Sequence, residues 1–281
     1  RPVRRALVLV TLVALAAPAA SAAGERQVGI HGSAFDPRRI NIVVGDSLRW
    51  SNHDFQNHNI HTDTALFPDH TLNPNTSWSP SPTPFTSENQ TGIPYVCTIH
   101  ANMAGTIAVW NVWLGDPAVA TYGSKARFTG LAHASASIQI EKSDGTPVGA
   151  PAPASGSGAY TALVSGLAPG LYRANDGTYL SRTVTLKVKP KLTITKRKVR
   201  KGVWAVSVKA APNQKGATAT VDRKKGFGWA KLASKSFGAS SKAAFTVKVP
   251  TSKSQLRVRV RLTKAQNNYS PATSASFVLK R

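Results

Sequence analysis

Long apolar runs are almost absent from this sequence, and the first one, Ala6–Ala17, is short. It falls below the ~20 apolar residues that a membrane-spanning helix needs. Three arginines among the first five residues precede it, and Ala20-Ser21-Ala22 follows it, which is the pattern of a secretory signal peptide. We therefore expect residues 1–22 to be a signal peptide. The mature protein should be secreted or otherwise extracytoplasmic, without a transmembrane span.

Sulfur is equally scarce, because Cys97 is the only cysteine and Met103 the only methionine in 281 residues. A single cysteine excludes a disulfide within the chain. Exported proteins usually keep their cysteines in disulfides, so an unpaired thiol there needs protection from oxidation. Burial in a core and ligation of a metal would both protect Cys97, and its occurrence alone leaves both interpretations open.

Acidic residues are few and unevenly placed. Residues 24–116 hold four Lys or Arg against eight Asp or Glu, a net charge of −4, and residues 117–189 hold seven against three. Residues 190–281 hold twenty-two against one, Asp222, a net charge of +21. So basic a segment favours ionic association with an anionic cell wall or membrane surface. A solvated face is the alternative, and export argues against a nucleic-acid partner.

Helical periodicity is missing after the signal peptide, and short alternating runs broken by Gly, Pro, Asn and Ser replace it. Such strands, about 8–12 residues apart, are typical of immunoglobulin-like (Ig-like) sandwiches. We expect a first β domain over residues 23–115, an Ig-like domain over 116–189 and a basic Ig-like domain over 190–281. Residues 68–84, rich in Pro, Ser, Thr and Asn, indicate an irregular loop.

The residues with metal-binding chemistry gather in the first segment. Cys97, His100 and Met103 lie within seven residues, on a loop between two expected strands. Two imidazoles and a thiolate with a weak axial thioether make the mononuclear blue-copper site of electron-transfer proteins. A further imidazole would come from an upstream group, which holds His53, His58 and His61.

Two other chemistries suit this loop less well. Zinc sites use thiolate, imidazole and carboxylate rather than thioether. A nucleophilic Cys–His pair usually joins residues that are distant in the sequence. We therefore expect a metal site rather than an enzyme.

Residues 28–110 resemble the cupredoxin family, most closely its amicyanin and plastocyanin branch. The matching residues are Phe35-Asp-Pro37, Ile40-x-Ile-x-x-Gly45-Asp46, Trp50-x-Asn52, His58-Asn59 and Cys97-x-x-His100-x-x-Met103-x-Gly105. The resemblance implies an all-β protein, in which a cupredoxin Greek-key β-sandwich precedes two Ig-like β-sandwich domains. It further implies one copper ion, Cu(I) or Cu(II), with four ligands: His58, Cys97, His100 and Met103.

The resemblance also assigns roles around the ligands. The ligand histidine stands directly before an asparagine, which favours His58 over His61 and leaves His31, His53 and His70 at the surface. The backbone N–H of Asn59 would donate to the thiolate, and its side chain would bond Thr98. The implied function is one-electron transfer to a redox protein that docks on an apolar patch around His100, which Ile99, Ala101 and Ala104 would form. The alternative is a wall-associated binding or adhesion protein that holds copper without a redox role.

Overall fold

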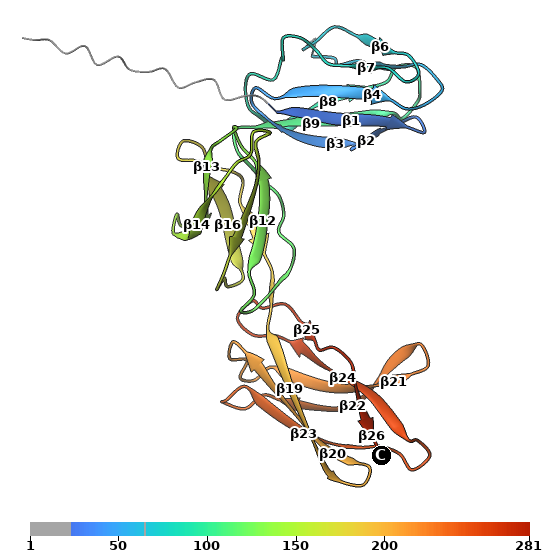
Figure 1. Cartoon of the computed structure of the whole chain (residues 1–281), viewed down its shortest axis with the longest axis vertical. Helices are drawn as coiled ribbons and strands as arrows, with labels where there is room; N and C mark the ends of the chain where they lie inside the picture. The colour runs from blue at the N-terminus through green and yellow to red at the C-terminus, as the bar shows by residue number, and fades with distance from the viewer. Residues whose placement is uncertain (1–23, 65) are drawn as a thin grey trace, which may run out of the picture.

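The structure, a computed structural model, describes residues 24–64 and 66–281. The signal peptide predicted for residues 1–22 lies outside the described residues. The described part of the chain consists of strands, turns and loops without a helix, which confirms the all-β prediction. Correspondingly, no helix there is long and apolar enough to cross a membrane. Figure 1 shows three β-rich parts that follow one another, from blue strands at one end to red strands at the other.

The first part contains two sheets and a separate strand pair. One sheet has the order β2 (Ala34–Asp36), β1 (Glu25–His31), β4 (Ser47–Asn52), β7 (Ser77–Trp78), and the other has β3 (Arg39–Val43), β9 (Ala104–Trp110), β8 (Asn89–Val96). The pair is β5 (His58–Ile60) with β6 (His70–Leu72). β1 lies parallel to β4, and β3 lies parallel to β9. Their alternating apolar side chains share one buried cluster, which also contains Cys97 and Met103.

One close approach in this core fixes the start of β9. Tyr95 on β8 is paired with Gly105 on β9, and its ring is buried. A Cβ atom at residue 105 would lie 2.3 Å from the Tyr95 ring, well inside van der Waals contact. Glycine at this position therefore allows Tyr95 to pack directly against the strand that begins after Met103.

The expectation of an irregular loop over residues 68–84 was wrong in part. Strands β6 and β7 both lie within it. Leu72 on β6 is fully buried, and the ring of Trp78 on β7 stacks on Trp50 with centroids 5.6 Å apart. Core packing of these two apolar residues outweighs the turn-forming composition around them.

The second part has its own buried cluster, from Val112 to Val188. One sheet has the strand order β10 (Trp113–Leu114), β12 (Ala126–Leu131), β15 (Ala159–Val164). The other has the order β14 (Pro147–Pro153), β13 (Ser137–Lys142), β16 (Gly170–Asn175), β17 (Val184–Leu186). A separate parallel pair consists of β11 (Ala120–Thr121) and β18 (Val188–Lys189). Val112 and Leu114 belong to this core although they precede the expected boundary at residue 116. The buried core of the second part therefore begins just after β9.

The third part surrounds a third buried cluster, from Val206 to Leu279. One sheet has the strand order β19 (Lys191–Arg200), β20 (Val203–Ala211), β23 (Lys242–Lys248). The other has the order β22 (Gly228–Ser236), β21 (Thr218–Lys225), β24 (Gln255–Lys264), and both β25 (Ala272–Thr273) and β26 (Phe277–Lys280) pair with β24. Tyr269 of this part packs on the core of the second part, and the Ser270 N–H donates to the Val188 carbonyl at 2.9 Å. Whether these parts are Ig-like stays a prediction.

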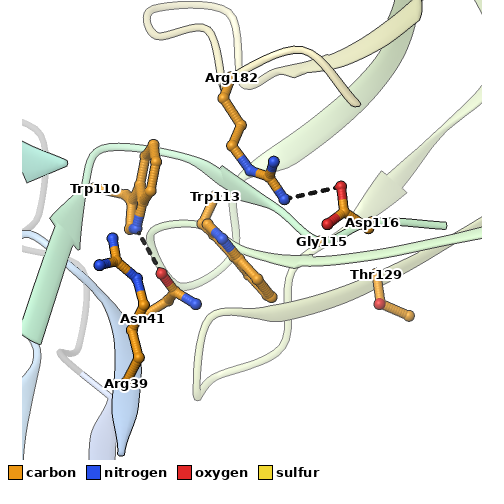
Figure 2. A pocket seen from close by; sticks show the side chains of 8 residues that line it. All are labelled: Arg39, Asn41, Trp110, Trp113, Gly115, Asp116, Thr129 and Arg182. Carbon is orange, nitrogen blue, oxygen red and sulfur yellow. Dashed lines mark hydrogen bonds and ion pairs between the residues drawn. The ribbon is translucent and has the colours of Figure 1, made fainter. Parts of the chain in front are cut away.

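The first and second parts meet at the start of β4. Asp46 accepts hydrogen bonds from Gly24 N and Arg26 Nε, each at 2.8 Å, and Arg26 Nη2 donates to the Ser157 carbonyl at 2.7 Å. A pocket of about 490 Å³ is lined from both parts, and Figure 2 shows in it the Trp110–Asn41 hydrogen bond and the Arg182–Asp116 ion pair. Because β4 runs from Asp46 toward Asn52, its far end lies away from this junction.

Candidate metal centre

Three segments of the first part converge beyond the far end of β4. His58 is the first residue of β5, Cys97 directly follows β8, and Met103 directly precedes β9. A reciprocal pair of backbone hydrogen bonds between His61 and Val96 holds β5 beside the end of β8. The Cys97 N–H donates to the Met103 carbonyl at 2.9 Å, which closes the loop between them. Strand pairing thus brings residues about forty positions apart to one place.

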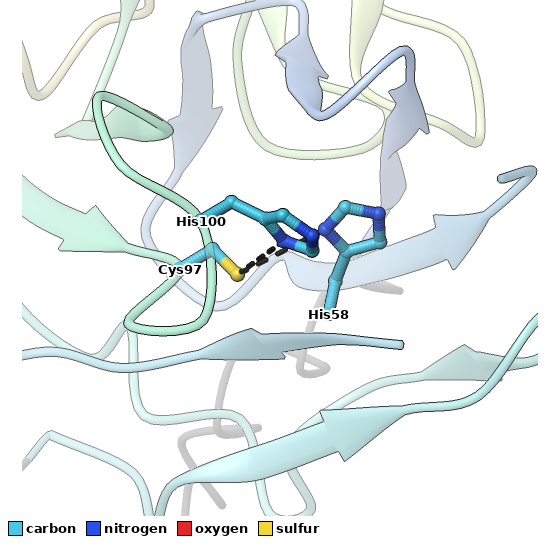
Figure 3. A group of neighbouring side chains, drawn as sticks. All are labelled: His58, Cys97 and His100. Carbon is cyan, nitrogen blue, oxygen red and sulfur yellow. Dashed lines mark hydrogen bonds between the residues drawn. The ribbon is translucent and has the colours of Figure 1, made fainter. Parts of the chain in front are cut away.

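Three donor atoms face one another there. Cys97 Sγ lies 3.8 Å from Nδ1 of His58 and 3.6 Å from Nδ1 of His100, and Figure 3 shows both rings turned toward the sulfur. All three donor atoms lie within 4.8 Å of one another. His58 is fully buried, Cys97 is buried, and His100 is half-buried. The arrangement therefore opens to the surface through His100.

These distances fit a metal ion bound by all three atoms. Metal–nitrogen and metal–thiolate bonds of about 2.0 and 2.3 Å, as in zinc sites, would separate N and S by roughly 3.7 Å at a trigonal angle near 120°. The observed separations are 3.6 and 3.8 Å. The side chains therefore require little movement to bind an ion between them.

Met103 is the fourth residue that the sequence analysis names as a ligand. Its side chain is 3% exposed and lies in the same apolar cluster as Cys97. Asn102, just before it, has a φ of +63°, a left-handed conformation that asparagine tolerates. Thiolate and thioether are soft donors that favour copper, whereas imidazole also suits harder metals. The combination fits copper better than zinc.

Asn59 connects β5 to the cysteine loop. Its backbone N–H points at Cys97 Sγ with an N–S distance of 3.5 Å. Its side chain donates to Thr98 Oγ1 at 2.9 Å and accepts from Thr98 N at 2.8 Å. These are the contacts that the cupredoxin resemblance implies for Asn59 and Thr98. They hold the thiol in place and give it a hydrogen-bond donor that stabilises a thiolate.

The sequence analysis missed two residues that hold the histidine rings from behind. Asp54 Oδ2 accepts from His58 Nε2 at 3.1 Å, and Gln56 Oε1 accepts from His100 Nε2 at 2.9 Å. Because each Nε2 donates, each Nδ1 keeps a free lone pair on the side of Cys97. Such outer contacts fix the tautomer and the orientation of metal-binding histidines.

Asn52 holds the loop that carries both of these residues. Its buried side chain donates to the carbonyls of Gln56 and Leu72, at 2.8 and 3.0 Å, and accepts from Asp54 N at 2.9 Å. The Trp50-x-Asn52 motif marked this region in the sequence. A carboxylate four residues before a candidate ligand histidine was the available signal for the hydrogen bond between Asp54 and His58.

The electrostatics keep His58 ready to bind a metal. Burial and the neighbouring His100 ring hold the pKa of His58 below its usual range, although the hydrogen bond to Asp54 opposes this shift. The pKa of Asp54 is also lowered, chiefly by the backbone N–H of Ser33 and also by Gly32 and His58, against the effect of burial. His58 is therefore neutral and Asp54 ionised near pH 7, which are the forms that ligation requires.

The remaining histidines of this part lie apart from Cys97. His61, the alternative upstream ligand, bonds Asp69 and Asp63 at 2.7 and 3.1 Å instead. His31 and His53 are exposed and stack on each other, and half-buried His70 stacks on Trp78. Of the three upstream candidates His53, His58 and His61, the structure brings His58 to the thiol.

Two large exposed apolar side chains are sequence neighbours of residues at the exposed edge of the site. Phe55 is 95% exposed and Ile99 is 52% exposed. Phe55 stands between Asp54 and Gln56, and Ile99 directly precedes His100. Ala101 is exposed, whereas Ala104 is half-buried. The expected apolar patch thus includes one large side chain that the sequence analysis did not single out.

Comparison with solved structures finds similarity to amicyanin, to a purple cupredoxin and to a copper-containing nitrite reductase, confined to about a third of the chain. A reduced amicyanin variant is 24% identical with a TM-score of 0.28, over 31% of this chain and 82% of its own. A purple cupredoxin from Nitrosopumilus maritimus is 23% identical with a TM-score of 0.26, over 30% of this chain and 97% of its own. A copper-containing nitrite reductase from Thermus scotoductus SA-01 is 24% identical with a TM-score of 0.26, over 30% of this chain and 22% of its own. No protein-family model and no curated protein sequence matches.

Proposed function

We propose that the first part of the chain binds one copper ion through His58, Cys97, His100 and Met103 and transfers single electrons outside the cytoplasm. The observation that supports this most directly is the pair of imidazole Nδ1 atoms 3.6 and 3.8 Å from one buried thiol. The motif Cys97-x-x-His100-x-x-Met103 supplies a thiolate, an imidazole and a thioether, which are the donor types of blue-copper sites.

A bound copper ion would supply a one-electron couple between Cu(I) and Cu(II), which a set of soft and intermediate donors keeps close in energy. The protein contributes rigidity. Asp54, Gln56 and Asn59 hold His58, His100 and the thiol at fixed positions through the hydrogen bonds described above. Little rearrangement is then needed when the charge on the site changes.

We propose that electrons enter and leave through His100. Its ring is half-buried, whereas His58 and Cys97 are enclosed by the core. Phe55 and Ile99 offer an apolar surface beside it on which a redox protein can dock. The proposed role is electron carriage rather than catalysis.

The visible spectrum with Cu(II) tests this proposal. The protein from Gly24 onward should bind one equivalent and become intensely coloured, because a copper–thiolate bond gives strong charge-transfer absorption. Cys97→Ser should bind copper without that colour. A colourless Cu(II) complex of folded wild-type protein would contradict a blue-copper site.

A binding or adhesion protein that holds copper without redox work is the alternative. The two functions differ in whether the bound copper can be reduced and reoxidised repeatedly. An electron carrier should be reduced by ascorbate and reoxidised repeatedly with full recovery of the colour. Loss of copper or of the colour after one cycle would favour the alternative.

We further propose that residues 190–281 retain the protein on an anionic surface of the cell envelope. This segment carries twenty-two basic residues and one acid. Asp222, that one acid, is fully buried, so no acidic side chain of this segment offsets the exposed lysines and arginines. An excess of exposed positive charge attracts anionic surfaces over the range of the Debye length.

A further inference from the structure

The hairpin formed by β21 and β22 joins strong positive charge to an exposed aromatic ring. Its tip reads Lys224-Lys225-Gly226-Phe227-Gly228-Trp229 and contains no acid. Phe227 is completely exposed, with a relative accessibility of 106%. The hairpin projects from the third part beside the β21 label in Figure 1.

The tip has a defined conformation. Lys224 pairs with Trp229 across the two strands, and Lys225 pairs with Gly228. Lys224 Nζ donates to the Phe227 carbonyl at 2.8 Å, and Gly226 turns the chain with a φ of +55°. The backbone of the tip is therefore defined by these contacts, and the Phe227 side chain extends into solvent.

The sheet face behind the tip presents ordered cations. Arg259 lies over the Trp229 ring, 4.4 Å from its centroid, and Lys224 Nζ lies 5.5 Å from it. Asp222 accepts from Arg259 Nε at 3.1 Å and from Nε and Nη2 of Arg261. One buried carboxylate thus fixes two guanidinium groups, and a net positive charge remains.

The ordered cations and the exposed Phe227 ring together indicate which kind of anionic surface the hairpin binds. Ordered cations alone would suit any polyanion, including a wall polymer. A polyphosphate chain, which has no apolar face, offers no contact to the fully exposed Phe227 ring. An anionic lipid bilayer can bind both the cations and the phenyl ring, because basic residues contact anionic headgroups and aromatic rings partition into the membrane interface.

We propose that the β21–β22 hairpin docks the protein on an anionic phospholipid bilayer. Phe227 enters the interface, and Lys224, Lys225 and Arg259 contact headgroup phosphates. This inference deepens the proposed retention on an anionic surface and does not depend on copper. It places contact at one small tip of the third part.

Vesicle binding of the full mature chain tests the proposal. Vesicles of phosphatidylcholine with about one third phosphatidylglycerol should sediment the protein, and pure phosphatidylcholine vesicles should not. Lys225→Glu should weaken binding about 30-fold, because each basic residue near such a surface contributes about fivefold and the change removes one charge and adds its opposite. Lys242→Glu, at an exposed position of β23 in the other sheet, gives the same net charge and should have a clearly smaller effect.

The aromatic ring has its own pair of variants. Phe227→Ala should weaken vesicle binding several-fold, and Phe227→Trp should restore it and be quenched by brominated lipid. Phe55→Ala removes the other almost fully exposed phenyl ring, on the first part, and should bind like wild type.

Binding to soluble polyphosphate separates the possible outcomes. If Phe227→Ala binds vesicles like wild type, the hairpin does not insert and the lipid proposal fails. If wild type binds polyphosphate but no vesicle, retention on an anionic polymer stands and the lipid proposal falls. If it binds neither, both fall, and the copper proposal is unaffected.

Discussion

His58 Nε2 lies 3.1 Å from Oδ2 of Asp54, so a carboxylate stands directly behind the buried imidazole of the candidate site. Asp54 is itself held by the backbone N–H groups of Gly32 and Ser33 at 2.7 and 2.8 Å. An ionised carboxylate in this position fixes the His58 tautomer and adds negative charge near the metal. It should therefore stabilise the more positive Cu(II) state.

We predict that Asp54→Asn raises the reduction potential of the copper site and weakens Cu(II) binding by about 10- to 100-fold. The asparagine can still accept a hydrogen bond but lacks the charge. Protein voltammetry and competitive Cu(II) titration measure the two effects. Asp63→Asn, which removes a carboxylate from His61, is the control and should change neither. An unchanged potential in Asp54→Asn would show that the carboxylate does not act on the metal.

The upstream ligand can be tested by comparing three alanine variants. His58→Ala should lose high-affinity copper binding and the colour, because its Nδ1 is one of the three converging donors. His61→Ala and His53→Ala should keep both, since these rings lie apart from Cys97. Intact binding in His58→Ala together with loss in His61→Ala would reverse the assignment.

Met103→Leu is predicted to keep copper and raise the reduction potential. An axial thioether bond is long and weak, so its removal costs little binding but disfavours Cu(II) more than Cu(I). Leucine also preserves the apolar packing of this buried position. Copper content and voltammetry are the measurements. A Met103→Leu protein without copper would make the thioether a principal ligand.

The sequence predicted the all-β fold from alternating apolar residues and the Cys97–Met103 loop from local spacing, whereas His58 and the Asn59 contacts were implied by the resemblance to cupredoxins. It did not predict Asp54 and Gln56 as partners of the histidines, since their roles appear only when the loop folds back over the ligands. Strands β6 and β7 were not predicted, because turn-forming residues surround Leu72 and Trp78 in the sequence. The packing of Tyr269 on the second core crosses the expected boundary at residue 190, and no local pattern encodes such a contact.

Asp222 should matter for the stability of the third part. Burial opposes its ionisation, but hydrogen bonds and charge from Arg261 and Arg259 outweigh burial and lower its pKa. A lowered pKa means that the stabilisation is fully present above the unfolded-state value near 3.8 and is lost as pH falls through the folded value. Asp222→Asn should destabilise by about 1–3 kcal/mol at pH 7, because two arginines lose their shared partner. Urea unfolding at pH 7 and pH 2.5 measures this. A gap between variant and wild type that persists undiminished at pH 2.5 would contradict the ionic origin.

The last prediction concerns retention through residues 190–281, whose charge of +21 contrasts with −4 over residues 24–116. Exposed charges are screened beyond about 10 Å at 0.1 M salt and beyond about 3 Å at 1 M. Molar salt without detergent should therefore release most of the protein from isolated cell wall or membrane fractions. A protein that ends at Lys189 should not be retained.

Truncation at Lys189 also removes Tyr269 from the second core, so a full-length variant must accompany it. We would replace four exposed lysines of β22 and β23 by glutamine, namely Lys231, Lys235, Lys242 and Lys248. This variant keeps every contact with the second part and should elute at clearly lower salt than wild type. Retention that survives 1 M salt, or that neither change reduces, would exclude an ionic anchor. The positive charge would then be a solvated face, and the copper centre would belong to a freely diffusing carrier.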